Sequence, residues 1–554
     1  MDNMRFVLVV LLGFILYQLS IYWEYDYGPK KVVPIVESTQ SDLSQETVQV
    51  EDLPSSSTDP TNILSEESHT EEIVSSIELA EKTIKVSTDK INLEIDSSGS
   101  LILLDMLEYP VEKETPDIPL KLLNNTKIDW FIAQSGFRSA KGFAPNHHSV
   151  YQFDKEDYQL APGENQLIVP LRWTNDFGIE VVSTFIFNRG SHAIELEQVV
   201  KNNSDRVWSG GQYNQLQRVV PSGDTSMFIR TYTGGVLYTE DQKYEKVSFD
   251  DMRDEKLSRD TKGGWSAMIQ HYFLAAWVPP ESHKNRFYSI ALPDNVFVIG
   301  SYGPQFDVQP GSERMFSSTL YAGPKIQKEM EKTAQGLELT VDYGVLTFIG
   351  KPIFWLLDNF HEYVKNWGVA IMLVTLVIKA IFFKLSEKSY RSMAKMRRLQ
   401  PKLQAIKERY EDDKPRFNQE MMNLYRAEKV NPLGGCLPIL VQIPVFISLY
   451  WVLIETVELR HAPFMLWIDD LSVKDPFFIL PLLMGVSMWI QQRLNPTPVD
   501  PIQEKVMKLF PIIFTVFFLF FPAGLVLYWV VNNSLSICQQ WYITRSIERG
   551  YSTE

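Results

Sequence analysis

The sequence predicts a polytopic α-helical membrane protein that carries one large soluble domain of β-strands. Three observations lead to this fold class. Apolar residues make up 45% of the 554 residues, but they concentrate near the N-terminus and after residue 350. Residues 24–350 carry a net charge of −20, whereas residues 384–430 contain 13 Lys and Arg against seven Asp and Glu. Between residues 81 and 345, short segments alternate apolar and polar side chains, as half-buried strands do.

The chain starts with an apolar segment that we expect to span the membrane. Residues 6–21 are apolar, and Tyr22 and Trp23 follow directly. A cleaved signal peptide ends in small residues, whereas aromatic side chains are typical of a membrane interface. Residues 1–27 are therefore predicted to form an uncleaved signal-anchor span. Residues 28–80 are rich in Ser, Thr, Glu, Asp and Pro, which predicts a disordered acidic linker.

Residues 81–345 are predicted to form an antiparallel β-sandwich. Alternating segments separated by Gly, Asn and Pro turns occur at 91–95, 166–173, 181–187, 192–200, 286–292 and 295–300. His147 and His148 should face opposite sides of an extended chain, so we interpret them as solvated rather than metal-binding. We find no nucleophile elbow, phosphate loop or distinct pair of carboxylates in this segment. The pattern favours an interaction or spacer domain over an enzyme.

The membrane part begins after the β domain. Residues 350–366 are predicted to form an amphipathic helix in the outer interface, because their apolar side chains share one helical face. Residues 367–383 form the next predicted span. The basic stretch 384–430 has apolar residues at helical spacing and is interrupted near Pro415, which predicts a helical hairpin. Its positive charge places the hairpin in the cytoplasm.

Four further spans complete the predicted membrane part, at 434–454, 476–491, 506–520 and 524–543. The apolar stretch from 506 to 543 is too long for one crossing of about 20 residues, and the sequence FPAG at 521–524 supplies a break. Six spans place both termini in the cytoplasm, on the same side as the basic hairpin. Residues 545–554 then form a short cytoplasmic tail.

Lys379 is the most unusual residue of the predicted spans. A cation inside hydrocarbon costs about 2.5–3.5 kcal/mol on insertion scales, so such residues usually face a wet cavity. Its ammonium could instead snorkel past Lys384 to the cytoplasmic headgroups. Thr375 lies one helical turn earlier on the same face, and no Asp or Glu occurs at mid-depth in the spans. The other polar residues of the spans are Gln442, Thr515, Asn532, Asn533, Gln539 and Gln540.

Two functional classes fit a solvated pocket with one cation. A polytopic channel or solute carrier needs a path across both leaflets, commonly with repeated halves and ionisable relays, and we find neither in the sequence. A factor that helps membrane proteins to insert needs only a polar recess on one side. The one-sided basic hairpin suits such a factor. The pattern favours insertion, with the channel or carrier as the alternative.

Four motifs resemble the YidC/Oxa/Alb insertase family. They are SMAKMRRLQP from residue 392, AEKVNPLGGCLP from 427, PIIFTVFF from 511 and FPAGLVLY from 521. With the N-terminal anchor, they are similar to the Gram-negative form of the family. The resemblance implies an inner-membrane insertase with a periplasmic β-supersandwich in residues 81–345 and a five-span core in residues 367–544. It implies no catalysis and no bound cofactor.

The resemblance also implies a groove that is open to cytoplasm and lipid and receives the client. The conserved cation of that groove corresponds to Lys379, and Thr375 and Gln442 match polar positions beside it. Asn532, a polar residue of the last span, is a further candidate for the groove. Client-contacting apolar and aromatic positions correspond to Ile443, Pro444, Ile512, Phe517, Tyr528 and Trp529.

The partners implied are nascent inner-membrane proteins, the Sec translocon with its accessory subunits, membrane lipids, and ribosomes or targeting factors that meet the hairpin 384–430. No specificity for nucleic acid is implied. The chain departs from the family at four places, one of which is Trp529, where a second Tyr is often found. Lys379 stands where Arg is usual, so the charge is kept but the fork of donors is lost. Lys384 stands where Pro is common, so we expect the second span to continue without a kink. The tail is short and not basic, so we do not expect it to assist ribosome binding.

Overall fold

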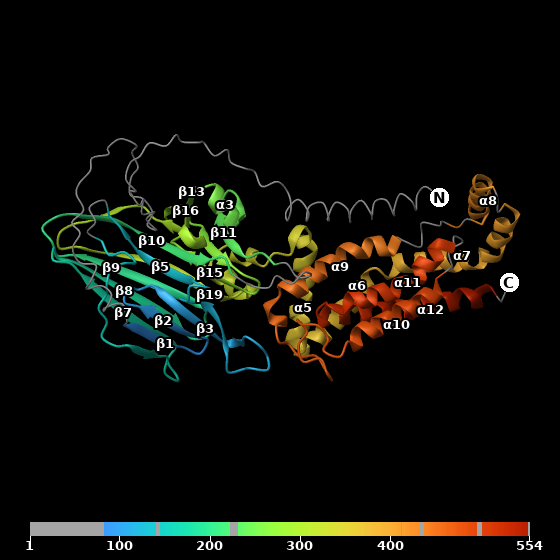
Figure 1. Cartoon of the computed structure of the whole chain (residues 1–554), viewed down its shortest axis with the longest axis horizontal. Helices are drawn as coiled ribbons and strands as arrows, with labels where there is room; N and C mark the ends of the chain where they lie inside the picture. The colour runs from blue at the N-terminus through green and yellow to red at the C-terminus, as the bar shows by residue number, and fades with distance from the viewer. Residues whose placement is uncertain are drawn as a thin grey trace, which may run out of the picture.

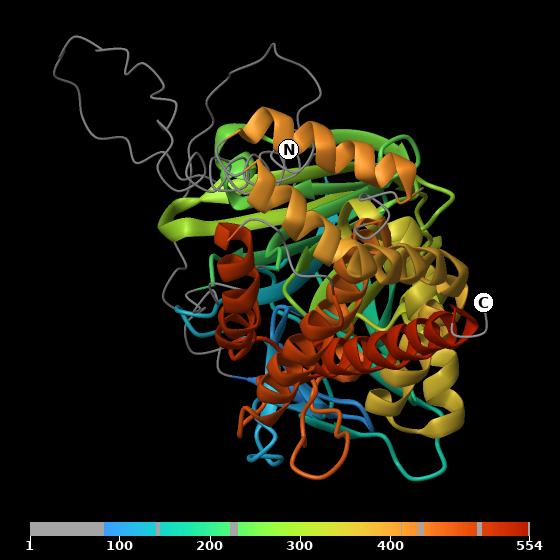
Figure 2. The same ribbon diagram turned by 90° about the vertical axis from the view of Figure 1, so that its right-hand side faces the viewer.

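The computed structural model describes residues 82–139, 144–221, 231–410, 413–428, 430, 437–495 and 501–551. A β-sandwich forms one end of an elongated molecule, and a bundle of helices extends from it to the other end (Figure 1). Figure 2, turned by 90°, shows the helices standing in front of the sheets. The anchor predicted for residues 1–27 and the linker predicted for residues 28–80 lie outside the described residues.

The first sheet of the sandwich has 11 strands in the order β13-β16-β17-β10-β5-β3-β2-β1-β6, with β18 paired to β10 and β4 paired to β3. Among the described strands of this sheet, β1 and β6 are the one pair that runs parallel. Its strands are β1 (Thr83–Ser87), β2 (Ile91–Asp96), β3 (Leu101–Pro110), β4 (Pro119–Leu123), β5 (Phe131–Arg138), β6 (Asp157–Gln159), β10 (Trp208–Val219), β13 (Ser258–Lys262), β16 (Lys284–Leu292), β17 (Val296–Tyr302) and β18 (Phe306–Val308).

The second sheet has eight strands in the order β12-β11-β14-β15-β19-β9-β8-β7. They are β7 (Gln166–Thr174), β8 (Ile179–Asn188), β9 (Ala193–Asn202), β11 (Gly234–Thr239), β12 (Lys243–Val247), β14 (Trp265–Ile269), β15 (Phe273–Val278) and β19 (Glu313–Pro324). The alternation in the sequence reappears as burial: β2 buries Ile91, Leu93 and Ile95 and leaves the residues between them partly exposed. The predicted β fold of this domain is confirmed.

The interpretation of the histidine pair is wrong for His147. This residue is buried, and its Nδ1 lies 2.6 Å from the hydroxyl of Tyr213 on β10. The two imidazole rings do not face opposite ways, since their centroids are 4.1 Å apart. The segment is a turn rather than a strand, so the alternation of an extended chain does not apply.

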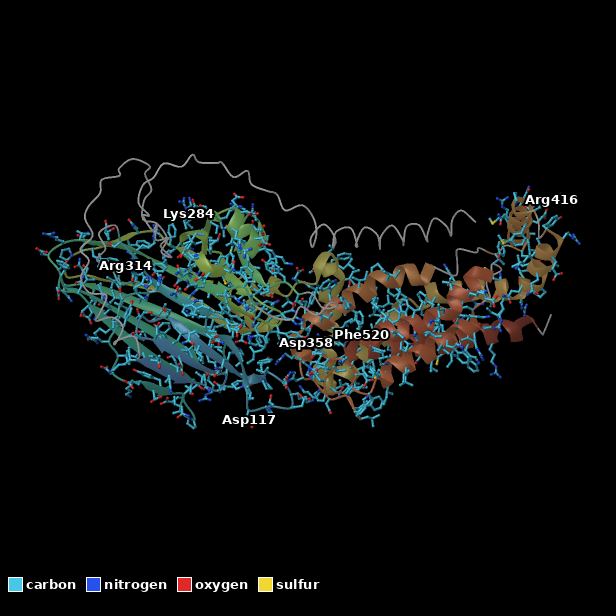
Figure 3. The ribbon with its side chains drawn as sticks, in the orientation of Figure 1. Asp117, Lys284, Arg314, Asp358, Arg416 and Phe520 are labelled. Carbon is cyan, nitrogen blue, oxygen red and sulfur yellow. The ribbon has the colours of Figure 1, made fainter. Side chains whose placement is uncertain are left out.

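Helices fill the rest of the described chain. Short ones lie in or next to the β-sandwich: α3 (Phe249–Asp254), α4 (Gln327–Thr333), η1 (Pro293–Asn295), η2 (Leu337–Thr340) and η3 (Gly344–Leu346). The helical part consists of α5 (Thr347–Val364), α6 (Trp367–Ile381), α7 (Phe383–Arg409), α8 (Lys414–Ala427), α9 (Leu437–Glu455), η5 (Val457–Leu459), α10 (Ile479–Leu494), α11 (Pro501–Phe518) and α12 (Ala523–Tyr551). Helices α7 and α8 form the end of the molecule farthest from the sandwich, where Arg416 lies (Figure 3).

The expectation that the second span continues without a kink is wrong. Helix α6 ends at Ile381, and α7 begins at Phe383 with its axis turned by 67°. No proline stands at the break. Among the described residues, no single helix has both the length and the mean hydropathy needed to cross a membrane, whereas α6 and α7 meet that criterion together as a bent pair.

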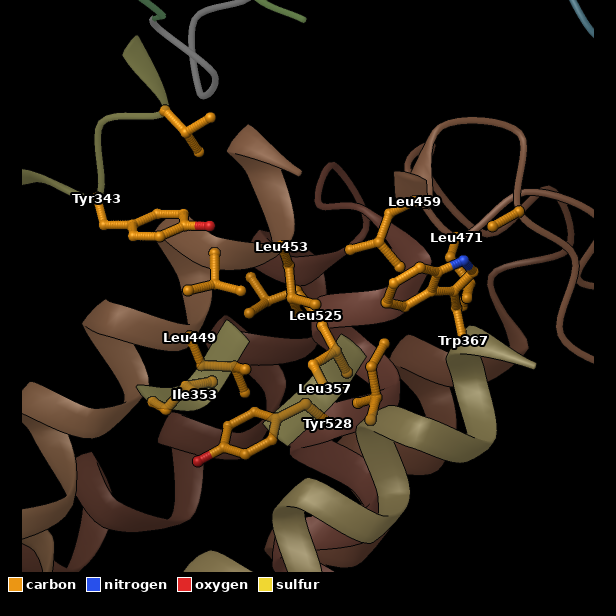
Figure 4. Packing of buried hydrophobic residues seen from close by; sticks show 14 of the residues in the cluster. Tyr343, Ile353, Leu357, Trp367, Leu449, Leu453, Leu459, Leu471, Leu525 and Tyr528 are labelled. Atoms are coloured by element: carbon orange, nitrogen blue, oxygen red, sulfur yellow. The ribbon is translucent and has the colours of Figure 1, made fainter. Parts of the chain in front are cut away.

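The sandwich and the helices share one apolar core. The cluster runs from Val236 and Trp265 in the second sheet, through Tyr343, to residues of α5, α6, α9 and α12. Figure 4 shows its helical side, where Ile353, Leu357, Leu449, Leu453 and Tyr528 pack together. Because this apolar area is continuous, the two parts are held together as neighbouring layers of one fold are.

Polar contacts orient the junction. Lys325 at the end of β19 and Glu455 at the end of α9 form an ion pair of 3.6 Å that is almost fully buried. Arg460 donates hydrogen bonds to the carbonyls of Pro110 and Val111 at 2.7 and 3.0 Å. Lys328 on α4 lies 2.9 Å from Asp358 on α5. Removing one partner of a buried pair leaves an uncompensated charge, so these contacts favour one orientation of the sandwich on the helices.

His271 belongs to the same junction and titrates abnormally. Its Nε2–H donates to the carbonyl of Ile454 at 3.0 Å, and its ring stacks on Tyr272. The pKa of His271 is lowered to about 4, mainly by burial and also by the nearby cations Lys325 and Arg460, against the opposite effect of the hydrogen bond to Ile454. The folded protein therefore keeps this imidazole neutral at pH values at which the unfolded chain would protonate it.

This difference predicts a loss of stability in acid. Between pH 6.5 and pH 4 the unfolded chain binds one more proton at His271 than the folded chain, so stability falls as the pH falls. From pH 7 to pH 5 this group should contribute a loss of about 2 kcal/mol. The variant His271→Gln keeps a donor without titrating, and its thermal unfolding should depend less on pH. The exposed His148→Gln is the control, and equal pH slopes for all three proteins would contradict the assignment.

Candidate functional site

Helix α6 is positioned at its start by Asn366 and Gly368. The side chain of Asn366 accepts a hydrogen bond from the backbone N–H of Val369, and its Nδ2 donates to the carbonyl of Phe464 at 2.8 Å. A Cβ on Gly368 would lie 2.0 Å from the ring of Phe464, so only glycine allows this close approach. The helix is thus fixed against the loop that follows α9, which determines where Lys379 lies near the other end of the helix.

Lys379 points toward α12. Its side chain is half-buried, and Nζ donates a hydrogen bond of 2.7 Å to the hydroxyl of Ser536. That hydroxyl donates in turn to the backbone carbonyl of Asn532, also at 2.7 Å. In the part of the chain that the structure describes, no carboxylate lies within ion-pair distance of Lys379. The ammonium is therefore held by neutral oxygen rather than by a counter-ion.

Gln442 reaches the same place from α9. Its Nε2 donates to the side-chain oxygen of Asn532. Asn532 and Ser536 are four residues apart, on one face of α12. Lys379, Gln442, Asn532 and Ser536 thus form a connected group that we call the polar cluster. It joins α6, α9 and α12, and the first three of these residues are candidates that the sequence pattern indicated.

Ser536 is the residue that sequence reasoning missed. Ser536 lies four residues after Asn532, so both side chains project from the same face of the helix toward the same neighbours. This spacing could have identified Ser536 from the sequence. Thr375, which was expected beside Lys379, is buried, and its hydroxyl donates to the carbonyl of Ile371 at 2.7 Å within α6. Threonine often uses its hydroxyl in this way inside helices. Thr375 is consequently close to the polar cluster along α6 and hydrogen-bonded to its own helix.

The aromatic candidates lie in the packed interior. Tyr528 is buried and stacks on Phe446 of α9, with ring centroids 6.1 Å apart. The edge of Trp529 meets Phe446 at 4.6 Å and Phe518 at 5.3 Å, both measured between centroids. Pro444 is half-buried one turn before Ser448, whose hydroxyl donates to its carbonyl. These side chains pack α9, α11 and α12 together near the polar cluster.

The apolar candidates lie on the outer surface. Ile443 is 40% exposed, Ile512 61% and Phe517 44%. Further exposed apolar side chains lie on α10 and α11, namely Leu482, Leu483, Val486, Trp489, Ile490, Val506, Leu509, Phe510, Ile513 and Val516. A patch of this kind is rare on proteins that face water and is normal on those that face lipid. The helical part therefore presents apolar residues outward and keeps its polar cluster inside.

The last helix connects the others through its polar side chains. Asn533 donates to the hydroxyl of Ser487 on α10 at 3.0 Å. Gln539 donates to the carbonyl of Phe383, at the bend between α6 and α7. Gln540 donates to the carbonyl of Leu494 at 3.2 Å, where α10 ends. Carbonyls in the last turn of a helix lack partners within their own helix, so Gln540 satisfies one such group, that of Leu494. Across the described residues, no group of three His, Cys, Asp or Glu side chains is placed to hold a metal ion.

Comparisons with known proteins cover nearly the whole chain. A family model described as "YidC periplasmic domain" matches residues 83–356, and one described as "60Kd inner membrane protein" matches residues 359–550. A protein of Methylococcus capsulatus named "Membrane protein insertase YidC" is 56% identical, with 99% of each chain covered. A protein of the same name from Thioalkalivibrio sulfidiphilus is 48% identical, again with 99% of each chain covered. A solved structure titled "Active YidC insertase crystal structure with the first transmembrane domain resolved" is 17% identical, with a TM-score of 0.38, over 84% of this chain and 93% of the other.

The bond between Lys379 and Ser536 leads to a stability prediction. The variant Ser536→Ala removes the acceptor of a charged donor, which should cost about 1–3 kcal/mol of unfolding free energy. Ser534→Ala is the matched control, because Ser534 is exposed on the same helix and its hydroxyl bonds only to the Val530 carbonyl. Thermal unfolding of the purified variants in detergent measures the difference. Equal melting temperatures for the two variants would show that the ammonium does not depend on Ser536.

Proposed function

This chain belongs to the YidC family of membrane protein insertases, and we propose that its polar cluster is the place where polar segments of client proteins enter the membrane. The protein is an inner-membrane insertase with a large periplasmic domain. The contacts of Lys379 and its neighbours support a mechanism for that activity.

The observation that carries the proposal is the bond between the Lys379 ammonium and a serine hydroxyl. A hydroxyl is a weak partner for a cation compared with a carboxylate, because only the carboxylate brings an opposite charge. An acidic residue of a client can therefore displace Ser536 as the partner of Lys379 and gain a charged contact. Once the client has moved on, Ser536 takes the ammonium back, and the cation is never left without an oxygen partner.

The rest of the polar cluster lowers the cost of bringing polar backbone out of water. Gln442 and Asn532 offer amide donors and acceptors that a passing peptide can use in place of water. Because every unpaired backbone group in hydrocarbon costs several kcal/mol, even a few such partners lower the barrier. Thr375 belongs to this path as a small polar residue of α6, on the same helical face as Lys379.

The apolar part of the client takes a different route. We assign its contacts to Ile443, Pro444, Ile512 and Phe517, three of which are exposed at the surface of α9 and α11. Tyr528 and Trp529 support this surface from the inside through their packing on Phe446 and Phe518. A client helix can thus exchange contacts with these side chains for contacts with lipid, which is nearly as apolar, at little cost.

The topology that we propose has six spans, with both termini in the cytoplasm. The spans are residues 1–27, 367–383, 434–454, 476–491, 506–520 and 524–543. Support comes from the charge of the chain: the basic hairpin 384–430 is opposite in sign to the acidic residues 24–350. No covalent chemistry or cofactor is required for the mechanism.

The partners that we propose beyond the client proteins are the Sec translocon with its accessory subunits, membrane lipids, and ribosomes or targeting factors. The hairpin formed by α7 and α8 suits ribosomal RNA or an acidic factor, because its excess charge is positive and contact would be electrostatic rather than sequence-specific. The periplasmic sandwich is free to meet translocon subunits on the opposite side of the membrane.

The charge of Lys379 should decide which clients insert. We expect Lys379→Arg to retain activity and Lys379→Glu to lose roughly tenfold or more on clients with acidic translocated segments, since like charges repel where opposite charges attracted. Reconstituted liposomes and protease protection of the translocated segment provide the measurement. A client with a neutral translocated segment is the control and should be affected much less.

Two outcomes would contradict this mechanism. Full activity of Lys379→Ala on the acidic client would show that the cation is dispensable. Passage of small solutes through the same liposomes without client insertion would favour a channel or carrier instead.

The hairpin has its own test. Arg416→Glu and Arg426→Glu reverse two exposed charges on α8, and we expect weaker co-sedimentation with ribosomes, by roughly tenfold at low salt. Reversing two charges on the periplasmic side, Lys284→Glu and Arg314→Glu, is the control and should leave ribosome binding unchanged. Unchanged binding of the α8 variant would remove the hairpin from the ribosome contact.

A further inference from the structure

An apolar groove lies between α10 and α12, away from the polar cluster. It has a volume of about 440 Å³, room for roughly ten to fifteen groups of the size of a water molecule, and its lining residues are Ile490, Leu494, Ile537, Cys538, Trp541 and Tyr542. Gln540 fixes one side of the groove, because it donates to the carbonyl of Leu494 and to the side-chain oxygen of Asn495. The groove is open to the surface, and nothing polar lines it except the ends of the aromatic side chains and the thiol.

Two arginines flank this groove, one from each helix. Arg493 precedes the lining residue Leu494, and its guanidinium lies 3.7 Å from the ring centroid of Trp489. Arg545 follows Trp541 by one helical turn and lies 5.2 Å from that ring. Both side chains are exposed, and neither forms an ion pair with another described residue. A guanidinium on an aromatic face is held in place yet keeps its N–H donors free for an anion.

We propose that this groove binds one anionic phospholipid. One of its two acyl chains lies along the apolar floor, and the phosphate accepts hydrogen bonds from Arg493 and Arg545. Helix α10 ends here, and α12 continues to Tyr551 toward the end of the molecule where the basic hairpin lies, which we have assigned to the cytoplasm (Figure 1). The phosphates of the cytoplasmic leaflet lie at the depth of the end of α10, and arginine binds phosphate through paired N–H groups. The inference extends the proposed function, because it names a resident lipid beside the insertion path.

The lipid contact has a structural consequence for the insertase. The groove joins the end of α10 to the part of α12 that follows Ser536. A lipid seated there holds the two helices at a fixed spacing while the client passes on the other side of α12. The same contact places negative charge next to the two arginines at the cytoplasmic ends of the spans.

Native mass spectrometry of the purified full-length protein tests the proposal. The probes are phosphatidylglycerol and phosphatidylcholine with the same acyl chains, offered at equal concentration. We expect retained phosphatidylglycerol to exceed phosphatidylcholine, and the double variant Arg493→Gln with Arg545→Gln to reduce that preference roughly tenfold. The control, Lys505→Gln with Lys508→Gln, removes the same charge from the neighbouring α11 and should leave the preference unchanged. Equal losses in both double variants would overturn the site, because they would show a general effect of charge.

A second measurement tests the apolar part and separates this site from the insertion path. Cys538→Trp fills the groove but leaves both arginines, so it should reduce retention of both lipids several-fold while Lys379 variants leave it unchanged. A photoreactive probe attached to Cys538, with Cys436 replaced by Ser, should cross-link to lipid. Cross-links to residues 1–27, to a second copy of the chain or to a client would overturn the proposal, as would displacement of the lipid by soluble glycerol phosphate. Insertion assays on the same variants are a separate measurement from lipid retention. A negative result for lipid binding would therefore not contradict the insertase function.

Discussion

The hydrogen bond from Lys379 to Ser536 is the interaction on which the helical part depends. A cation placed among apolar helices must have an oxygen partner, and the Ser536 hydroxyl of α12 supplies it here. The bond draws α6 against α12, and Asn532 extends it to Gln442 on α9. The partner is a hydroxyl and not a carboxylate, and we propose that the ammonium is satisfied in this way in the resting protein and available to an acidic group of a client.

The same last helix resolves a second constraint. Helix ends leave carbonyls without partners, and such groups are costly wherever water is scarce. Gln540 satisfies such a carbonyl at the end of α10, and Gln539 bonds the carbonyl of Phe383, the first residue of α7. This contact joins α12 to the chain just after the bend of 67°, which forms without a proline. The bend also directs α7 away from the bundle, so that the basic hairpin stands clear of the spans.

The β-sandwich is not a separate domain joined to the helices only by the chain, because its apolar core continues into the helices. The buried pair of Lys325 and Glu455 and the contact of His271 with Ile454 orient the two parts at the end of α9. Since α9 also carries Gln442, the periplasmic junction and the polar cluster lie on one helix. The low pKa of His271 makes this junction sensitive to acid.

The sequence by itself determined the fold class, the strands and the candidates Lys379, Gln442 and Asn532. Period-two alternation, long apolar stretches and the separation of charge are properties of short segments of the sequence. They can be read without knowing how the helices and strands pack together. Only the tertiary structure decided which polar atoms meet. Ser536 was missed, Thr375 bonds to its own helix, His147 is buried against Tyr213, and the helix bends at Phe382 although no proline requires it. These outcomes depend on how each helix is rotated and where its neighbours end, and packing between distant segments sets both.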